Sequence, residues 1–283
     1  MSGPGDVTHA EHAWVVPSSG RTLFYHEWKP PRCEATLIII HGFGEHAGRY
    51  DALARSLAGC GMYVAAPDLW GHGRSSGARG DIHDLSGCVK ELRAMVENVL
   101  LPGSGSASYA VFGHSFGGLL AIVWALEAPS IIRRLVVQSP FLEVGFRIPI
   151  VKKVAANLLA LCWPTASLSM NLEISALSRN PQVVQAYRTD PLVHNRMTAR
   201  TYRAIIRTRD EIMRQAGLLT VPTLLLCGTG DRIISVAVAR QWFERLRCRK
   251  SVVTFPDSYH ELHHEPVRED VIRLTRDWML NTR

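Results

Sequence analysis

The stretch of sequence that decides the fold reads Tyr109-Ala110-Val111-Phe112-Gly113-His114-Ser115-Phe116-Gly117-Gly118. Its first four residues form a short apolar run typical of a buried strand, and residues 116–126 have the composition of a helix. A serine on a tight turn from strand to helix must adopt strained dihedral angles, so the residues two positions before and after it must be small. Gly113 and Gly117 meet this requirement. The pattern therefore predicts that Ser115 is a nucleophile, rather than a serine in an ordinary glycine-rich turn.

The segments around this turn alternate between short apolar strands and longer helices. We expect a hairpin of residues 13–16 and 22–28, then strands at residues 37–40, 63–66, 109–112, 135–138, 223–227 and 252–255. We expect helices at residues 53–58, 85–100, 116–126, 236–246 and 266–280, and a Gly/Ser linker at 102–108. Continuous apolar strands separated by helices indicate a mostly parallel sheet with helices on both faces.

Residues 141–220 interrupt this alternation. They contain several helical stretches and no segment that we predict to be a strand. We expect a core formed by residues 1–140 and 221–283, with residues 141–220 inserted as a helical cap. Such a cap would lie over the carboxyl ends of the strands, where α/β sheets bind their ligands.

The composition excludes several classes of protein. The chain has 283 residues, of which 47% are hydrophobic and 20% charged, so a sizeable core is available and disorder is not expected. The net charge is +7, but the basic residues are scattered, which favours general solubility or attraction to an anionic membrane surface over nucleic-acid binding.

The location follows from cysteine usage and hydropathy. The six cysteines lie far apart without a CxxC pair, and we interpret them as small buried residues of a protein in a reducing compartment. The first twelve residues lack the pattern of a signal peptide. The most apolar run, residues 154–163, is shorter than the ~20 residues that span a bilayer. We expect a cytoplasmic protein that is at most peripheral at a membrane.

An acid and a base follow Ser115 in the order Ser…Asp…His that this type of site uses. Residues 224–231 read as a buried strand entering a Gly-rich turn that ends in Asp231, although Asp231 could instead cap the next helix. His260 follows the strand 252–255 on a loop, where it could take the proton of Ser115 while Asp231 fixes its tautomer. His263 and His264 compete for this role, but we interpret them as the polar start of the last helix.

The oxyanion hole is expected to use two backbone N–H groups. One comes from Phe116, directly after the nucleophile, and the other from Phe43 in the loop His41-Gly42-Phe43-Gly44. His41 and His72 are interpreted as scaffolding of their loops.

The residues His260-Glu261-Leu262-His263-His264 also match H-E-x-x-H, the pattern of zinc metalloproteases. That chemistry requires both end histidines on one face of a helix. Pro266 predicts that the last helix begins there and leaves the pattern in a loop. We therefore favour acyl transfer from serine, which needs no metal and no organic cofactor.

The chain resembles the monoglyceride lipase and lysophospholipase group of α/β-hydrolase-fold serine hydrolases over nearly its whole length. The resemblance rests on the nucleophile motif and on residues 41–50 (HGFGEHAGRY), 68–75 (DLWGHGRS), 177–180 (LSRN), 190–192 (DPL) and 228–231 (GTGD). It implies an α/β-hydrolase fold with a helical cap. It also implies a carboxylic ester hydrolase that cleaves monoacylglycerol to glycerol and fatty acid through an acyl-enzyme on Ser115.

Several alternatives use the same Ser115, Asp231 and His260. A lysophospholipase, a broad short-chain esterase and an S33-type peptidase would all do so, and fold alone does not choose among them. A non-catalytic binding protein of hydrolase fold would lack one of the three residues, and none is missing here.

The resemblance further implies that Glu45, His46 and Arg49 lie near the polar head of a glycerol ester, with Tyr187 of the cap beside them. The alternative for Glu45 and Arg49 is hydrogen bonding within the loop and the start of a helix. In one departure, Ile234 stands where mammalian monoglyceride lipases have a cysteine, so thiol-directed behaviour of that site is not expected here.

The cap contains an amphipathic segment at residues 148–162. Apolar side chains fill about half of its helical circumference, and Lys152, Lys153 and Asn157 lie opposite. This suits a helix that contacts a membrane surface or closes an acyl tunnel. A helix packed on the sheet edge would show the same pattern.

Overall fold

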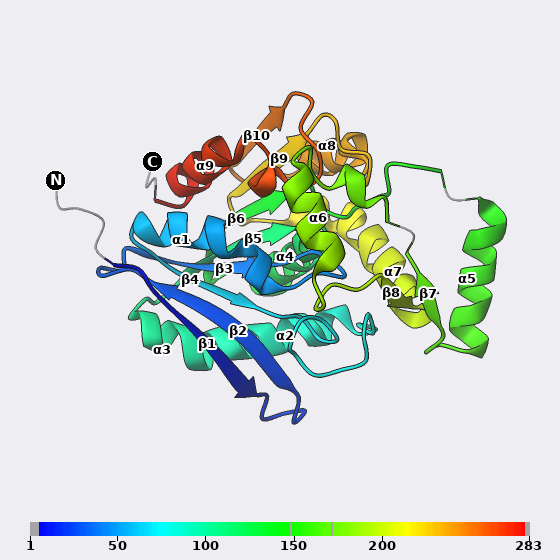
Figure 1. The fold of residues 1–283 in the computed structure, drawn as a ribbon, viewed down its shortest axis with the longest axis horizontal. Helices are drawn as coiled ribbons and strands as arrows, with labels where there is room; N and C mark the ends of the chain where they lie inside the picture. The colour runs from blue at the N-terminus through cyan, green and yellow to red at the C-terminus, as the bar shows by residue number, and fades with distance from the viewer. Residues whose placement is uncertain (1–5, 148, 171, 281–283) are drawn as a thin grey trace.

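The computed structural model describes residues 6–147, 149–170 and 172–280, and an eight-stranded sheet forms its centre (Figure 1). The spatial order of this sheet is β1-β2-β4-β3-β5-β6-β9-β10. Its strands are β1 (Thr8–Val15), β2 (Thr22–Lys29), β3 (Ala35–Ile40), β4 (Met62–Pro67), β5 (Tyr109–His114), β6 (Ile132–Gln138), β9 (Thr223–Gly228) and β10 (Lys250–Phe255). The six strands from β4 to β10 in this order pair in parallel, whereas β2 is antiparallel to both β1 and β4.

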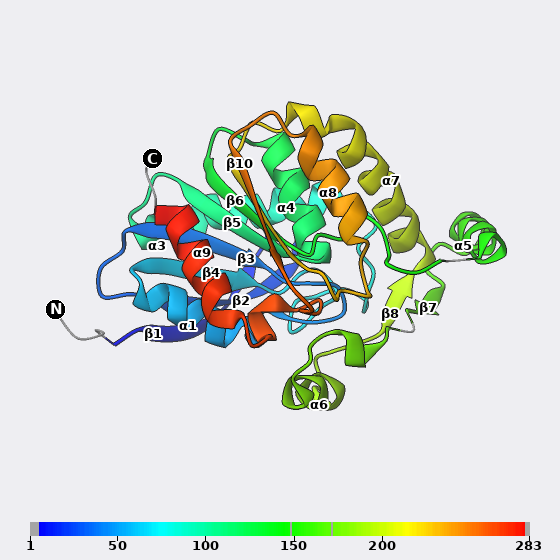
Figure 2. The same cartoon turned by 90° about the horizontal axis from the view of Figure 1, so that it is seen from above.

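Helices cover both faces of the sheet, as Figure 2 shows. The described helices are α1 (Asp51–Gly59), α2 (Leu85–Met95), α3 (Leu101–Ser104), α4 (Phe116–Glu127), α5 (Ile150–Cys162), α6 (Pro181–Thr189), α7 (Ala199–Gln215), α8 (Val236–Arg245) and α9 (Arg268–Leu280). Strand β3 shows how the two layers arise, since neighbouring side chains of a strand point to opposite faces. Leu37 and Ile39 pack with α1 and α9, and Ile38 and Ile40 pack with α2, α4 and α8. The predicted fold is thus confirmed.

Two local predictions differ from the structure. The hairpin begins earlier than expected, because β1 already pairs with β2 from Thr8. The linker predicted at 102–108 is helical at its start, since a π-helical turn Val96–Leu100 leads into α3. Pro102 lies in the first turn of α3, where no backbone N–H is needed, and Gly105 ends the helix with φ 68°.

The segment between β6 and β9 lies beyond the carboxyl ends of the parallel strands (Figure 1). It contains α5, α6, α7 and 3-10 turns at Ile174–Ala176 and Ala216–Leu218. It also contains two short antiparallel strands, β7 (Ser167–Ser169) and β8 (Arg196–Thr198), so the prediction that this segment has no strand is wrong. Three residues are too few to show the alternating pattern of a strand in the sequence.

None of the helices in the described part of the chain is both long and apolar enough to cross a membrane.

Candidate active site

Ser115 lies in the turn between β5 and α4 with φ 52° and ψ −117°, a strained conformation for a residue with a side chain. Two glycines make this turn possible. A Cβ on Gly113 would lie 2.4 Å from the carbonyl oxygen of Gly117, and a Cβ on Gly117 would lie 2.1 Å from that of Ile40. Ser115 also donates its N–H to the carbonyl oxygen of Gln138 at 3.0 Å, which ties the turn to the end of β6. The predicted strand–turn–helix geometry is therefore present.

His260 and Asp231 meet beside this turn. Nδ1 of His260 lies 2.7 Å from Oδ2 of Asp231, and both side chains are buried. The other oxygen of Asp231 accepts the N–H groups of Ile233 and Ile234 at 2.8 and 3.1 Å. Burial opposes ionisation of Asp231, but the charge and hydrogen bond of His260 and these two N–H groups outweigh it, so its pKa lies below the ordinary value.

The interpretation of Asp231 as a helix cap is wrong. The N-cap of α8 is Ser235, whose side chain accepts the N–H of Val238 at 3.4 Å. One carboxylate oxygen of Asp231 instead accepts N–H groups of its own turn, and the other faces His260. The His260 loop is fixed from a second side, because the Ser139 hydroxyl donates to the carbonyl oxygen of His260 at 3.1 Å.

The zinc pattern is not assembled. Glu261, the expected general base, is held by both Nη atoms of Arg49 at 2.7 Å each. Nδ1 of His260 faces Asp231, and residues Leu262–His264 form a single 3-10 turn rather than an α-helix. His263 is buried and accepts a hydrogen bond from Nε2 of Gln138 at 2.8 Å, so the interpretation of His263 as a polar helix start is wrong.

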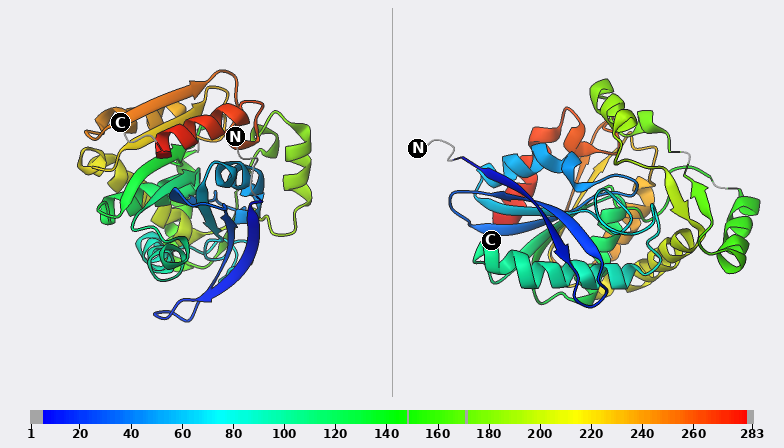
Figure 3. Two further views of the ribbon diagram at one scale, coloured as in Figure 1. Left: turned by 90° about the vertical axis from the view of Figure 1, so that its left-hand side faces the viewer. Right: turned by 60° about the horizontal axis from the view of Figure 1, so that its bottom comes forward.

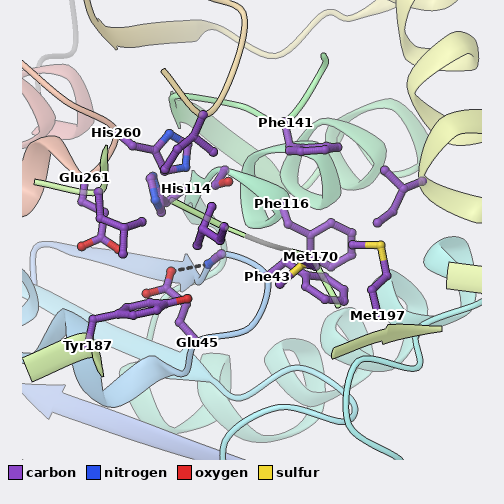
Figure 4. Close-up of a pocket in the computed structure, with 16 residues that line it drawn as sticks. Phe43, Glu45, His114, Phe116, Phe141, Met170, Tyr187, Met197, His260 and Glu261 are labelled. Atoms are coloured by element: carbon purple, nitrogen blue, oxygen red, sulfur yellow. Dashed lines mark hydrogen bonds between the residues drawn. The ribbon is translucent and has the colours of Figure 1, made fainter. Parts of the chain in front are cut away.

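The loop that carries Phe43 is braced on two sides. His41 donates from Nδ1 to the carbonyl oxygen of Gly42 and accepts the N–H of Leu69 at Nε2, which confirms its scaffolding role. Glu45 accepts the N–H of Gly42 at 2.6 Å, drawn as the dashed line in Figure 4. The ring of Phe43 then meets that of Phe116 edge-on at 5.2 Å, which brings both predicted N–H carriers beside Ser115.

Phe116 is the first residue of α4, so its N–H has no acceptor within the helix. Positive potential at a helix N-terminus favours negative charge at this position. Such a position suits an oxyanion that forms when Ser115 attacks a carbonyl carbon.

A buried charged cluster of Glu45, Arg49 and Glu261 lies under the same site. Arg49 pairs with both carboxylates, and its guanidinium lies 4.6 Å from the centre of the Tyr187 ring. The hydroxyl of Tyr50 donates to Glu45 at 2.7 Å. Two carboxylates around one guanidinium leave a net charge of −1. Glu45 and Arg49 thus make the contacts expected from the alternative in which they form hydrogen bonds within the loop.

Of the four predicted substrate-binding residues, two line the pocket at Ser115, namely Glu45 and Tyr187. Arg49 lies behind them in the charged cluster. His46 points elsewhere, since its Nε2 lies 2.8 Å from Oδ2 of Asp190 and its Nδ1 accepts the N–H of Gly48. His46 thereby connects the loop of residues 41–50 to the segment that follows α6.

The charged cluster acts on His260. Burial lowers the pKa of this imidazole, but the charge and hydrogen bond of Asp231, then the charges of Glu261 and Glu45, outweigh burial and raise it above its ordinary value. A general base must be neutral, so hydrolysis should increase as the pH rises through this pKa.

We expect Glu261→Gln to move the acid limb of the kcat/KM–pH profile to lower pH. The change removes one negative charge near His260, which destabilises the imidazolium and lowers the pKa of His260. The measurement is kcat/KM for a soluble ester across pH 4 to 9. Glu173→Gln is the matched control, because Glu173 pairs with Arg232 at the surface. An unchanged midpoint, or one moved to higher pH, would contradict this account of the cluster.

The pocket at Ser115 has a polar and an apolar side, as Figure 4 shows. His114, His260, Glu45 and Glu261 form the polar side. The apolar side consists of Phe43, Phe116, Phe141, Met170, Leu172, Leu177, Met197, Ile205 and Ile233. A second cavity shares Phe141, Met197 and Ile205 with the first. Its other lining residues are Val144, Asn157, Tyr202, Ile206 and the ion pair of Glu143 with Arg209.

Helix α5 contributes none of the described residues that line the first pocket, but its Asn157 lines the second cavity. Ile148, the predicted start of this helix, and the side chains of Lys152 and Lys153 lie outside the described residues.

Comparison with known proteins identifies the family. Residues 31–267 match the family described as serine aminopeptidase, S33. The monoacylglycerol lipase of Mycolicibacterium smegmatis is 31% identical over 279 residues, covering 97% of this chain and 98% of that protein. Human monoglyceride lipase is 33% identical over 266 residues, covering 93% and 87%. The crystal structure of the monoacylglycerol lipase of Paleococcus ferrophilus matches with a TM-score of 0.81 and 30% identity, covering 98% and 99%.

The chain therefore belongs to the S33 family of α/β-hydrolase-fold serine hydrolases, and its resemblance to the monoglyceride lipase group is confirmed.

Proposed function

We propose that the protein hydrolyses long-chain monoacylglycerols to glycerol and fatty acid. Residues 141–220 act as a cap whose side chains form part of the pocket wall. Ser115 is the nucleophile, His260 the general base and Asp231 the acid that orients it. The N–H groups of Phe43 and Phe116 bind the oxyanion, and Glu45 and Tyr187 lie near the glycerol.

The reaction would proceed in two halves. Oγ of Ser115 attacks the ester carbonyl carbon while its proton passes to Nε2 of His260, and the carbonyl oxygen becomes an oxyanion. The ester C–O bond then breaks, and His260 returns the proton to the departing glycerol oxygen. In the second half, water gives a proton to His260 and attacks the acyl-enzyme, which releases the fatty acid and regenerates the Ser115 hydroxyl. The carboxylate of Asp231 stabilises the imidazolium of His260 in both halves.

The observation that carries this proposal is the chemical division of the pocket. An apolar wall that continues into a second cavity suits one acyl chain, and the side with Glu45 and Glu261 suits hydroxyl groups. The related monoacylglycerol lipases support the same substrate class.

A second candidate is a lysophospholipase, because Bacillus subtilis phospholipase YtpA is 29% identical over 88% of this chain. The charge of the site favours the neutral glycerol ester. Glu45 and Glu261, the two carboxylates among the described lining residues, would repel a phosphate group, and Arg49 is already paired with both. A panel of oleoyl glycerol, oleoyl lysophosphatidylcholine, p-nitrophenyl acetate and a peptide substrate tests this. We expect the highest kcat/KM for oleoyl glycerol, and a higher value for the lysolipid or the peptide would overturn the proposal.

We expect Ile205→Phe to lower kcat/KM for oleoyl glycerol by about 10-fold or more and to change p-nitrophenyl acetate hydrolysis little. Ile205 of α7 is buried where the two cavities meet, so a larger ring would block the path of a long chain. Each excluded methylene costs ~0.8 kcal/mol of apolar burial, so two or three suffice for this loss. The thermal melting curve controls for misfolding. Equal losses on both substrates would mean that the acyl chain takes another path.

We also propose that the protein works in the cytoplasm and touches a lipid surface through α5. All six cysteines are free thiols, which supports a reducing compartment, although only Cys88 and Cys227 are buried as expected. Helix α5 packs against α7 but lies apart from the sheet (Figures 1 and 2). Five of its apolar side chains are 52% to 79% exposed, namely Ile150, Val151, Val154, Leu158 and Leu161. An exposed apolar helix face near a lipid-binding pocket suits contact with the surface that holds the substrate.

We expect the double change Leu158→Ser with Leu161→Ser to weaken binding to phosphatidylcholine vesicles containing an anionic lipid by about 10-fold or more. The change removes two apolar contacts of α5 with the acyl region. Leu218→Ser is the matched control, because Leu218 is 71% exposed in a 3-10 turn outside α5. Sedimentation with vesicles measures the binding. Equal binding by the double variant and wild type would show that α5 does not contact the membrane.

A further inference from the structure

The hairpin of β1 and β2 brings two histidines and a glutamate to one face of the sheet edge. In Figure 3 this hairpin extends along the edge in dark blue. Glu11 pairs directly with His26 across the strands, and His9 pairs with Trp28. Because side chains two residues apart in a strand share a face, His9 and Glu11 lie on the same side as His26 and Trp28.

The ligand atoms of these three side chains converge. Nε2 of His9 lies 3.1 Å from Nδ1 of His26, and that Nδ1 lies 3.6 Å from Oε1 of Glu11. All three atoms lie within 4.8 Å of one another. A metal ion with bonds of about 2.0–2.1 Å holds neighbouring ligand atoms about 3.0–3.4 Å apart. The group is therefore within a small side-chain adjustment of a coordination site.

The surroundings orient all three side chains. The rings of His9 and His26 stack with that of Trp28 at 5.0 and 5.6 Å between centres. Glu11 accepts a hydrogen bond at Oε2 from Nη1 of Arg74 at 2.7 Å, so its Oε1 remains turned toward His26. Such secondary contacts that fix ligand orientation are typical of metal sites.

The local charge favours a cation. The three side chains border an open cavity of about 290 Å³, whose described lining also includes Asp51 and Asp68. Arg74 pairs with Glu11 and Arg55 pairs with Asp51, so the three carboxylates exceed the two guanidinium groups by one negative charge. None of His9, Glu11 and His26 is among the lining residues of the pocket at Ser115, so an ion here takes no part in ester hydrolysis.

We propose that His9, Glu11 and His26 bind one divalent transition-metal ion of the zinc class. Two imidazoles and a carboxylate are a ligand set that zinc uses, and water completes the coordination sphere. The ion takes the place of the hydrogen bond between the two rings, each neutral ring carries its proton on the nitrogen that does not bind the metal, and the ion links β1 to β2. Because the folded chain alone brings these ligands together, binding raises the stability of the fold.

The test titrates zinc into the full, tag-free chain by isothermal titration calorimetry. We expect one site per chain in wild type. Loss of a residue that only orients a metal ligand weakens binding about 10- to 100-fold, so loss of a ligand itself in His9→Gln or Glu11→Gln should weaken it by at least about 10-fold. His12→Gln is the matched control, since His12 lies on the opposite face of β1 and bonds Glu27 at 2.9 Å. It should bind zinc as wild type does.

Two further readouts locate the ion. Zinc should raise the melting temperature of wild type and His12→Gln, but not of His9→Gln. The near-ultraviolet spectrum of the cobalt complex should show no thiolate charge-transfer band. Equal zinc affinity in wild type, His9→Gln and Glu11→Gln would overturn the proposal. So would the absence of binding at millimolar zinc, or a thiolate band that places the ion at a cysteine.

Discussion

Ser115→Ala is expected to lower kcat/KM for oleoyl glycerol by on the order of 10⁴-fold or more. The change removes the oxygen that forms the acyl-enzyme, and the oxyanion hole and pocket alone leave only a small residual rate. The fold should persist, because the strained turn at Ser115 is held by backbone contacts and by the glycines at 113 and 117.

The measurement is steady-state hydrolysis, accompanied by circular dichroism and a melting curve. Ser86→Ala is the control, because Ser86 is an ordinary helical serine that donates to Glu127 at the surface. A Ser115→Ala enzyme that retains activity within tenfold of wild type would remove Ser115 from the mechanism.

His260→Ala is expected to cause a loss similar to that of Ser115→Ala, and the double variant should be hardly worse than either single one. The two residues act on the same proton, so their contributions are not additive. Asp231→Asn should lower kcat by on the order of 10⁴-fold, because an amide cannot hold the same imidazole tautomer or stabilise its charge.

His264→Ala distinguishes this mechanism from the zinc alternative, in which His264 would be a metal ligand. We expect a mild effect of His264→Ala, within about tenfold, and no effect of EDTA on ester hydrolysis. If His264→Ala and EDTA each abolished ester hydrolysis, the zinc mechanism would be the correct one.

The sequence predicted the features that depend on neighbouring residues. The strands 37–40 and 109–112 are continuous apolar runs, and the structure contains both within β3 and β5. The turn at Ser115 follows from glycines two positions away on either side, because their carbonyl contacts leave no room for a Cβ. The meeting of Asp231 with His260 follows from their positions at the ends of adjacent parallel strands, β9 and β10.

Features that depend on distant residues were missed. Arg49 and Glu261 are 212 positions apart, and nothing in the local pattern at either one predicts their ion pair. The sequence drew attention to Glu261 only through the zinc pattern. The burial of His263 against Gln138 was missed for the same reason, since a histidine near a helix start looks polar until its tertiary neighbours are known.

The most direct test of the central claim is labelling with a fluorophosphonate, followed by mass spectrometry of the intact chain and its peptides. Such a probe reacts with a serine that a neighbouring base activates. The account predicts one adduct per chain, on the peptide that contains Ser115. Prior addition of oleoyl glycerol should slow its formation, and the Ser115→Ala chain should form none. Labelling that persists in Ser115→Ala, or an unlabelled wild-type chain, would contradict the claim that Ser115 is the nucleophile of a lipid ester hydrolase.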